Sequence, residues 1–197
     1  MSDDAHEEAR AVVDFWFGAS GSAEYGRARK AWFAKDDGFD AAIRERFGPL
    51  IERALRGELE AWAAAPETAL ARILLLDQFT RNAYRGTPRS FAGDAQALAA
   101  ASRMVGARQD QALPVFMRGF VYLPFEHAES LAMQDEAIRL LGRLCDEAPC
   151  ESSMLDYAHR HRAVIERFGR FPHRNEILGR QSTAEELAYL AQPGSGF

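Results

Sequence analysis

Apolar residues recur along most of the chain at helical spacing. Ala9, Val12, Val13 and Trp16 lie at positions i, i+3, i+4 and i+7, so they share one face of an amphipathic helix. Gly18, directly after this stripe, is typical of a helix C-terminus. Similar stripes continue towards the C-terminal end, and no segment shows a convincing alternation of apolar and polar residues, as a β-strand would. The pattern predicts about nine helices with short connections.

Proline and capping residues predict where these helices begin and end. An apolar stripe that starts at Phe39 meets Gly48-Pro49, and we expect the helix to break there because proline donates no backbone hydrogen bond. Pro124 is expected to interrupt a later helix for the same reason. Thr183 and Glu186 have the spacing of a capping box, which predicts the start of the last helix.

The segment from Pro66 to about Tyr84 is the most apolar of the predicted helices. Its apolar residues cover more than one face, which indicates a helix buried among others. The chain has no linker rich in Gly, Ser or Pro, and it shows no strict tetratricopeptide repeat. We therefore expect an all-α fold with a single domain over residues 1–197.

Composition excludes several classes of protein. Of the 197 residues, 47% are hydrophobic and 27% are charged, as in ordinary globular domains. The net charge of −5 disfavours binding to nucleic acid or to an anionic membrane. The first residues lack the apolar core of a signal peptide, and the longest apolar stretches are far shorter than a membrane span. Cys145 and Cys150 could pair, but so few cysteines fit a reducing compartment better, so we expect two thiols and a cytoplasmic protein.

Charged residues interrupt the apolar surface of the 66–84 helix. Asp77 and Arg81 continue its apolar stripe by helical steps, and Gln78 and Asn82 form a second i,i+4 pair beside them. A charge on an inward face costs several kcal/mol unless it is paired or opens to a cavity. Two interpretations stay open: a buried ion pair that joins this helix to its neighbours, or the wall of a ligand pocket.

A histidine interrupts a second apolar face. His127 continues the stripe of Phe120 and Leu123, close after the helix interruption at Pro124. Such a histidine is either a hydrogen-bonded core residue or a member of a site. On a regular helix His127 and Glu129 would point in nearly opposite directions, so both could line one pocket only if the helix is distorted.

Arginine and histidine gather in a predicted loop after residue 168. The loop contains Arg170, His173, Arg174 and Asn175. Arginine forks bind carboxylates or phosphates, and histidine exchanges protons near neutral pH. A solvated basic turn is the alternative, but neighbouring apolar residues favour a loop packed against the core. His161, on the apolar stripe of the preceding helix, is either a core residue or close to this loop.

Standard catalytic motifs such as G-x-S-x-G, H-E-x-x-H or a Walker-type loop are missing from the chain. The spacing of His127, His161 and His173 gives no evidence of a metal site. We expect neither a metal nor a cofactor.

Two strings are specific enough to indicate a family: Leu76-Asp77-Gln78-Phe79-Thr80-Arg81-Asn82 and Phe168-Gly169-Arg170-Phe171-Pro172-His173-Arg174-Asn175. Weaker signals accompany them: Asp14-Phe15-Trp16-Phe17, Trp32-Phe33, Phe91 with Asp94, and Pro124-Phe125 with His127, Glu129 and Gln134. With these residues the chain resembles the bacterial domain-of-unknown-function 924 family, from about Val12 to Leu190.

The resemblance implies an all-α fold similar to tetratricopeptide superhelices, and it implies no particular reaction. Carried over by position, it points to nine site residues: Asp77, Gln78, Arg81, Asn82, His127, Arg170, His173, Arg174 and Asn175.

Three hypotheses of function follow. The one we favour is a domain that binds a small molecule, expected to be an anionic metabolite, through Gln78, Arg81, Asn82, Arg170, Arg174 and Asn175. The second is a metal-independent acid–base enzyme, a hydrolase or lyase acting on a small anionic substrate. In it His173 or His127 would be the acid or base, oriented by Asp77. The third is a tetratricopeptide-like scaffold for a peptide or protein partner.

Overall fold

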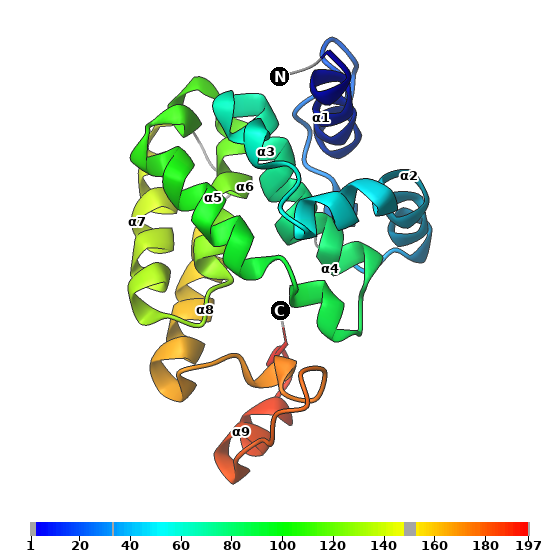
Figure 1. The fold of residues 1–197 in the computed structure, drawn as a ribbon. Coiled ribbons are helices and arrows are strands. Elements are labelled where there is room, and N and C mark those ends of the chain that lie inside the picture. Colours follow the sequence, from blue (N-terminus) through cyan, green and yellow to red (C-terminus); the bar gives the residue numbers. More distant parts are fainter. Residues whose placement is uncertain (1–2, 33, 148–152, 197) are drawn as a thin grey trace. The chain divides into compact units, whose positions relative to one another are not determined.

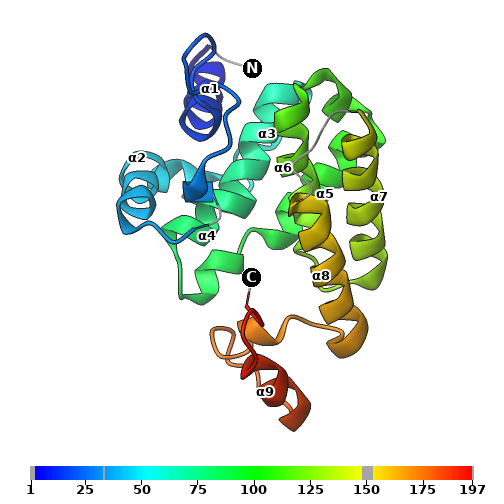
Figure 2. The same cartoon turned by 180° about the vertical axis from the view of Figure 1, so that it is seen from behind.

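The structure, a computed structural model, describes residues 3–32, 34–147 and 153–196. Over these residues it contains helices and no strand, which confirms the all-α fold. The α-helices are α1 (Asp3–Phe17), α2 (Asp37–Leu55), α3 (Pro66–Leu74), α4 (Thr80–Ala83), α5 (Asp94–Gly106), α6 (Val115–Glu126), α7 (Leu131–Glu147), α8 (Ser153–Phe168) and α9 (Ala184–Leu190) (Figures 1 and 2). Shorter 3₁₀ turns are η1 (Lys30–Trp32), η2 (Glu60–Ala64), η4 (Pro88–Phe91), η5 (Gln109–Ala112) and η6 (Pro172–Arg174), whereas η3 (Leu75–Phe79) is a π-helical turn.

Two compact units make up the chain, and each is described by itself. The first comprises Met1–Arg85 and Arg89–Pro124, and the second comprises Gly86–Pro88 and Phe125–Phe197. A single domain over residues 1–197 stays a prediction. The tetratricopeptide-like arrangement that the resemblance implies also stays a prediction.

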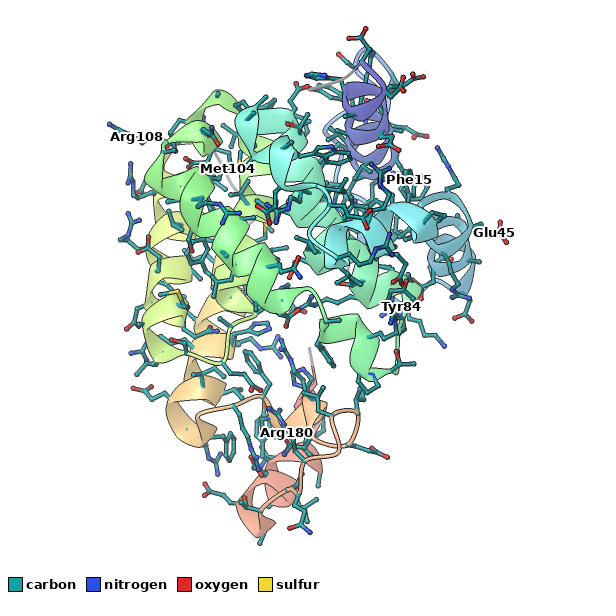
Figure 3. The ribbon with its side chains drawn as sticks, in the orientation of Figure 1. Phe15, Glu45, Tyr84, Met104, Arg108 and Arg180 are labelled. Atoms are coloured by element: carbon teal, nitrogen blue, oxygen red, sulfur yellow. The ribbon has the colours of Figure 1, made fainter. Side chains whose placement is uncertain are left out.

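Aromatic side chains from distant segments form the core of the first unit. The apolar face of α1 is buried, as its spacing predicts, and Trp16 on this face is fully enclosed. The ring centroid of Trp16 lies 5.3 Å from that of Phe79 and 5.7 Å from that of Phe120. Phe15, labelled in Figure 3, stacks on Phe39 of α2 at 5.2 Å. Such ring pairs add to the free energy of apolar burial and join α1 to the other helices of the unit.

Helix α2 runs through Gly48-Pro49, so the predicted break there is wrong. Its buried face continues on both sides of the proline, from Ile43 and Phe47 to Ile51. A proline inside a helix removes the hydrogen bond to the carbonyl four residues earlier, which here belongs to Glu45. Pro49 and Glu45 are both exposed, so water can hydrate that carbonyl. Burial of the apolar face therefore outweighs the lost hydrogen bond.

The predicted helix over residues 66–84 is present, but its middle is the π-helical turn η3. Helix α3, η3 and α4 follow one another without a break. The hydroxyl of Thr80, the first residue of α4, donates a hydrogen bond to the carbonyl oxygen of Leu76 in the turn at 2.9 Å. Gly93, just before α5, packs against the same carbonyl group. A π-helical turn rotates the following side chains around the helix axis, and such turns are frequent at functional sites.

In the second unit, α7 and α8 lie side by side, as both ribbon views show (Figures 1 and 2). The buried residues of α7 include Leu140 and Leu141, and those of α8 include Val164 and Ile165, so each helix buries an apolar face within the unit. Helix α8 ends before Gly169, as expected. This glycine has a φ of +69°, a left-handed conformation that residues with a side chain rarely adopt.

Helix ends elsewhere in the second unit also follow the local signals. Helix α6 runs through Pro124 and ends two residues later at Glu126, and α7 begins at Leu131, so the helix is interrupted as predicted, but after Pro124 and not at it. The capping box of α9 is present: the Thr183 side chain accepts from the backbone N–H of Glu186, and the Glu186 side chain accepts from that of Thr183.

None of the helices in the described part of the chain is both long enough and apolar enough to cross a membrane. Cys145, in the last turn of α7, is disulfide-bonded, so the prediction of a thiol is wrong for this residue. The number of cysteines does not show whether two of them come close enough to pair. Cys150 and Phe33 lie outside the described residues.

Candidate functional site

The predicted site residues divide between the two units. Those of the first unit lie on η3 and α4: Asp77, Gln78, Arg81 and Asn82. Those of the second unit are His127, Arg170, His173, Arg174 and Asn175. Cooperation of Asp77 with a histidine of the second unit stays a prediction.

Asp77 forms a buried ion pair with Arg81. Nη1 of Arg81 lies 3.1 Å from Oδ1 of Asp77, and it also donates to the main-chain carbonyl oxygen of Asp77 at 2.7 Å. The same nitrogen lies 3.0 Å from Oδ1 of Asp94 on α5. Burial alone would lower the pKa of Arg81, but the two carboxylates raise it above its usual value. One guanidinium held by two carboxylates thus joins α4 to α5.

The two neighbouring amides also have partners inside the first unit. Gln78 donates to Oδ2 of Asp77 at 2.5 Å. Asn82 donates to Oδ1 of Asp40 on α2 at 2.7 Å, and Arg85 donates to Oδ2 of Asp40 at 2.6 Å. These contacts favour the buried ion-pair interpretation of the polar residues on this helix. A ligand pocket at the same residues stays a prediction.

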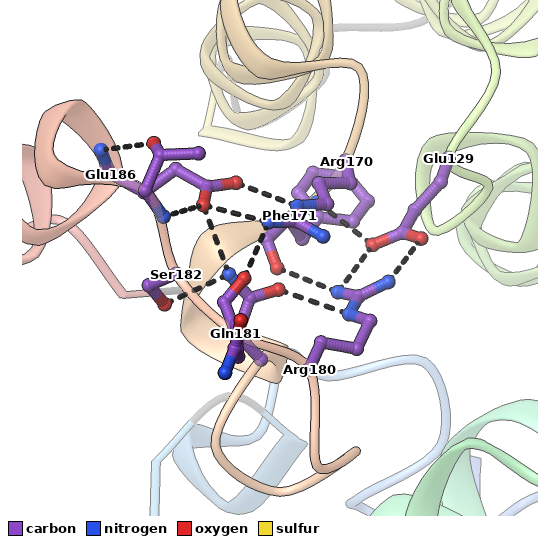
Figure 4. Close-up of polar contacts among 9 residues, drawn as sticks. Glu129, Arg170, Phe171, Arg180, Gln181, Ser182 and Glu186 are labelled. Carbon is purple, nitrogen blue, oxygen red and sulfur yellow. Dashed lines mark hydrogen bonds and ion pairs between the residues drawn. The ribbon is translucent and has the colours of Figure 1, made fainter.

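Arg170 binds the carboxylate of Glu186 with two nitrogen atoms. Nε lies 2.6 Å from Oε1, and Nη2 lies 2.8 Å from Oε2 (Figure 4). The hydrogen bonds from Arg170 lower the pKa of Glu186 to about 2. Because Glu186 also completes the capping box, Arg170 holds α9 to the segment that follows α8. This leaves the guanidinium fewer donors to offer a ligand.

Arg180, which is not among the predicted site residues, extends this network through Asn175, which donates to Oε2 of Glu186 at 3.3 Å (Figure 4). Its two Nη atoms lie 2.7 and 2.9 Å from the carboxylate of Glu129. Its Nε donates to Oδ1 of Asn175 at 2.9 Å, and Asn175 donates to the hydroxyl of Ser182 at 3.0 Å. Glu129 also accepts the backbone N–H of Phe171 at 2.8 Å. Asn175 and Arg180 therefore fix the segment between α8 and α9 to Glu129, in the turn before α7.

Two histidines lie against the ring of Phe171, and a third lies beside one of them. The ring centroid of Phe171 lies 5.4 Å from that of His161 and 5.6 Å from that of His173. The rings of His161 and His127 are 6.3 Å apart. Arg174 lies over the Phe171 ring at 4.6 Å and donates to the carbonyl oxygen of His127 at 3.1 Å. The structure thus brings His127, His173 and Arg174 into one cluster, and it shows the loop packed against the core through the fully buried Phe171.

His161 has a buried carboxylate partner that the predicted set lacks. Its Nδ1 lies 2.9 Å from Oε1 of Glu126, and both side chains are almost completely buried. The sequence offered one signal for this partner: Glu126 is a carboxylate at the end of an apolar segment, two residues after Pro124. Because α6 ends at Glu126, His127 and Glu129 lie in a turn, so the directions expected on a regular helix do not apply to them.

His173 lines an open cleft within the second unit. The cleft has a volume of about 730 Å³, and its lining combines His173, Arg180 and Ser182 with the apolar Leu187. Burial, reinforced by the charge of Arg174, lowers the pKa of His173 to about 4. The ring is therefore neutral at pH 7, so it has one donor and one acceptor nitrogen.

A metal site needs three or more His, Cys, Asp or Glu side chains that converge on one point. No such group occurs in residues 3–32, 34–147 and 153–196. The cluster and the cleft offer hydrogen bonding, charge pairing and proton transfer.

Comparison with known proteins identifies the family. A search of curated proteins gave no match. A solved structure, that of a protein of unknown function from Agrobacterium tumefaciens, is 41% identical to this chain, with a TM-score of 0.83. The alignment covers 95% of this chain and 99% of that one. A family model described as bacterial protein of unknown function (DUF924) matches residues 12–194, which include most of both units. The chain therefore belongs to the DUF924 family, as the resemblance of its two specific strings predicts.

Proposed function

We propose that this protein binds a small molecule in the cleft beside His173. The observation that carries the proposal is the cleft itself, whose volume of about 730 Å³ lies within the roughly 300 to 1,000 Å³ of most small-molecule sites. Pro172 and Leu187 supply apolar surface, and His173, Arg180 and Ser182 supply polar groups. A mainly apolar lining with a few fixed polar groups is typical of such sites.

We infer an anionic metabolite as the ligand, bound on the side of Arg180, since the lining also includes one carboxylate, that of Glu176. Neutral His173 can donate and accept a hydrogen bond. Arg180 carries a positive charge at the cleft, so an acidic group of the ligand would approach it and compete with Glu129 for its donors.

The lining is also held in place before any ligand arrives. Arg180 contacts Glu129, Asn175 and the carbonyl oxygen of Phe171. A site whose side chains are already fixed loses less conformational entropy on binding. This supports recognition of one class of small ligand over loose surface adsorption.

A titration followed by nuclear magnetic resonance tests the proposal with succinate as the carboxylate probe and succinamide as its neutral counterpart. Succinate should shift the amide resonances of Gln181 and Ser182 in a saturable way, and succinamide should do so less. The variant Leu187→Glu places a negative charge on the cleft and should weaken succinate binding about tenfold. Leu178→Glu, at an exposed leucine that does not line the cleft, is the matched control. The absence of a saturable shift with succinate, or equal binding by both variants, would overturn the proposal.

An acid–base enzyme is the second candidate, and the Glu126–His161 pair favours it. A carboxylate hydrogen-bonded to an imidazole is a common way to orient a catalytic histidine. His127, whose ring lies 6.3 Å from that of His161, would face the substrate. Hydrolysis of 4-nitrophenyl acetate or 4-nitrophenyl phosphate by the purified protein, lost in His127→Gln and in Glu126→Gln, would support this role. Equal rates in wild type and both variants would count against it.

The peptide-binding scaffold and the cytoplasmic location stay predictions. The disulfide at Cys145 is an argument against a reducing compartment, since disulfides are rare in one. Fractionation of cells that express the protein would test the location directly.

A further inference from the structure

Arg72 is a buried cation that belongs to neither of the networks described above. It lies on α3, and only 1% of its side chain is exposed. Its Nη2 pairs with Oε1 of Glu60. Within the described residues, neither Nε nor Nη1 has a hydrogen-bond partner, and both atoms are shielded from solvent. A charged donor that is buried without an acceptor is unfavourable, so these two nitrogens require an explanation.

A cavity of the first unit adjoins Arg72. Its volume is about 210 Å³, several times that of one water molecule. Small side chains leave this space open, among them Ala69 of α3 and Ala100 of α5. Met104, labelled in Figure 3, closes part of it from α5. The cavity therefore has room for a small polyatomic ion or molecule next to a buried guanidinium.

The charges at this cavity favour an anion. Its charged lining residues are Arg72 and Arg103. Glu60 is shared between them: its Oε1 pairs with Arg72, and its Oε2 lies 3.3 Å from Nη2 of Arg103. One carboxylate thus faces two guanidinium groups. Among Arg72, Arg103 and Glu60, one positive charge therefore remains uncompensated. Guanidinium groups bind carboxylate and phosphate oxygens better than neutral acceptors.

We propose that this cavity is a binding site for a small oxyanion, a carboxylate or a phosphate group. An oxyanion in the cavity would accept hydrogen bonds from the Nη1 or Nε of Arg72 and would be neutralised further by Arg103. The site is separate from the cleft beside His173, since its residues all belong to the first unit. Failure of the cleft proposal therefore leaves this one standing.

Thermal unfolding in the presence of inorganic phosphate or acetate tests the site, with sodium chloride at equal ionic strength as the reference. A ligand that binds only the folded protein raises the Tm. The rise grows with the ratio of the ligand concentration to its dissociation constant. We expect one of the two anions to raise the Tm above the chloride reference, and the larger response identifies phosphate or carboxylate as the preferred group.

Variants at the cavity assign the effect to Arg72. Arg72→Met should abolish the response, and Arg103→Gln should weaken the apparent affinity about tenfold. Because Arg72→Met can fail to fold, Ala100→Leu, which fills the cavity and keeps both arginines, is the second test and should also abolish the response. Arg10→Gln, at an exposed arginine of α1, should respond as wild type does.

Two results would overturn the proposal. The first is that neither anion raises the Tm of the wild-type protein above the chloride reference. The second is that Ala100→Leu and Arg103→Gln respond as strongly as wild type, which would mean that the anion binds elsewhere and that the cavity holds only water.

Discussion

The backbone of Gly93 packs directly against the carbonyl oxygen of Leu76: a Cβ atom added to Gly93 would lie 2.1 Å from that oxygen. Leu76 belongs to the π-helical turn that also carries Asp77, and Gly93 immediately precedes Asp94 at the start of α5. This close approach therefore sets the positions of both carboxylates that hold Arg81.

We expect Gly93→Ala to lower the free energy of unfolding by about 3 kcal/mol, because backbone atoms have to move to admit the methyl group. Urea unfolding followed by circular dichroism measures the loss. Gly106→Ala, at the other end of α5, is the matched control, since a Cβ there meets nothing within 4 Å. The control should be as stable as wild type or slightly more so, because alanine favours a helix over glycine. Equal destabilisation by both substitutions would contradict the proposed contact.

Asp77→Asn tests whether Asp77 is part of the framework of the first unit. The substitution removes one of the two carboxylates that hold Arg81, and a broken buried pair costs up to about 3 kcal/mol. Asp94→Asn should cost less, about 1 kcal/mol, because the Asp94 side chain is 23% exposed and Asp77 remains. Urea unfolding of both variants gives the comparison. A neutral or stabilising Asp77→Asn would indicate a carboxylate kept for a ligand instead.

Helical spacing predicted the elements whose formation depends on neighbours in the sequence. The stripe of α1 and the capping box of α9 are encoded within a few residues, and both are present. The continuous α2 and the π-helical turn depend on tertiary packing. Pro49 is tolerated because its side of the helix faces water, and the turn at Leu76 depends on Gly93, which comes from a later segment.

Residue types in the site were predictable, but their partners were not. The sequence indicates that Asp77 and Arg81 can pair on one helix face, yet it does not show that Asp94 joins them. Glu186 was predicted as a capping residue, and its second partner, Arg170, depends on the path of the intervening loop. Arg72 was missed, although a charge between Ala71 and Ile73 in the most apolar helix was a usable signal.

Arg170→Gln tests the link between the loop after α8 and α9. The substitution removes both hydrogen bonds to Glu186, so the amide protons of α9 should exchange with solvent about tenfold faster than in wild type. Arg167→Gln is the control, because Arg167 pairs with Glu185 on the exposed surface, where an ion pair contributes little. Similar exchange rates in the two variants would show that Arg170 does not hold α9.

The same pair predicts a dependence on pH. The pKa of Glu186 is about 2 in the folded protein against 4.5 ordinarily, so the pair stabilises the folded state fully above pH 4.5. This contribution is lost as the pH falls from 4.5 towards 2. The difference in hydrogen exchange between Arg170→Gln and wild type should therefore shrink over that range. A difference that is constant from neutral pH to about pH 2 would contradict the ion pair.

His173 should make the folded protein less stable in mild acid. Its pKa is about 4 in the folded state against 6.5 ordinarily, so between these values the unfolded chain binds a proton that the folded chain does not. The free energy of unfolding should fall by about 3 kcal/mol in total as the pH decreases through this range, since one pKa unit corresponds to about 1.4 kcal/mol.

His173→Gln removes this proton uptake. The free energy of unfolding of His173→Gln minus that of wild type should therefore be about 2 kcal/mol larger at about pH 5 than at about pH 8. Urea unfolding at both pH values measures this difference. His159→Gln, at an exposed histidine of α8, should keep the pH dependence of wild type. If His173→Gln and wild type instead lose stability in parallel, His173 takes up a proton in the folded protein as readily as in the unfolded chain. The cleft would then carry an additional positive charge in mild acid, and an anionic ligand should bind more tightly at pH 5 than at pH 8.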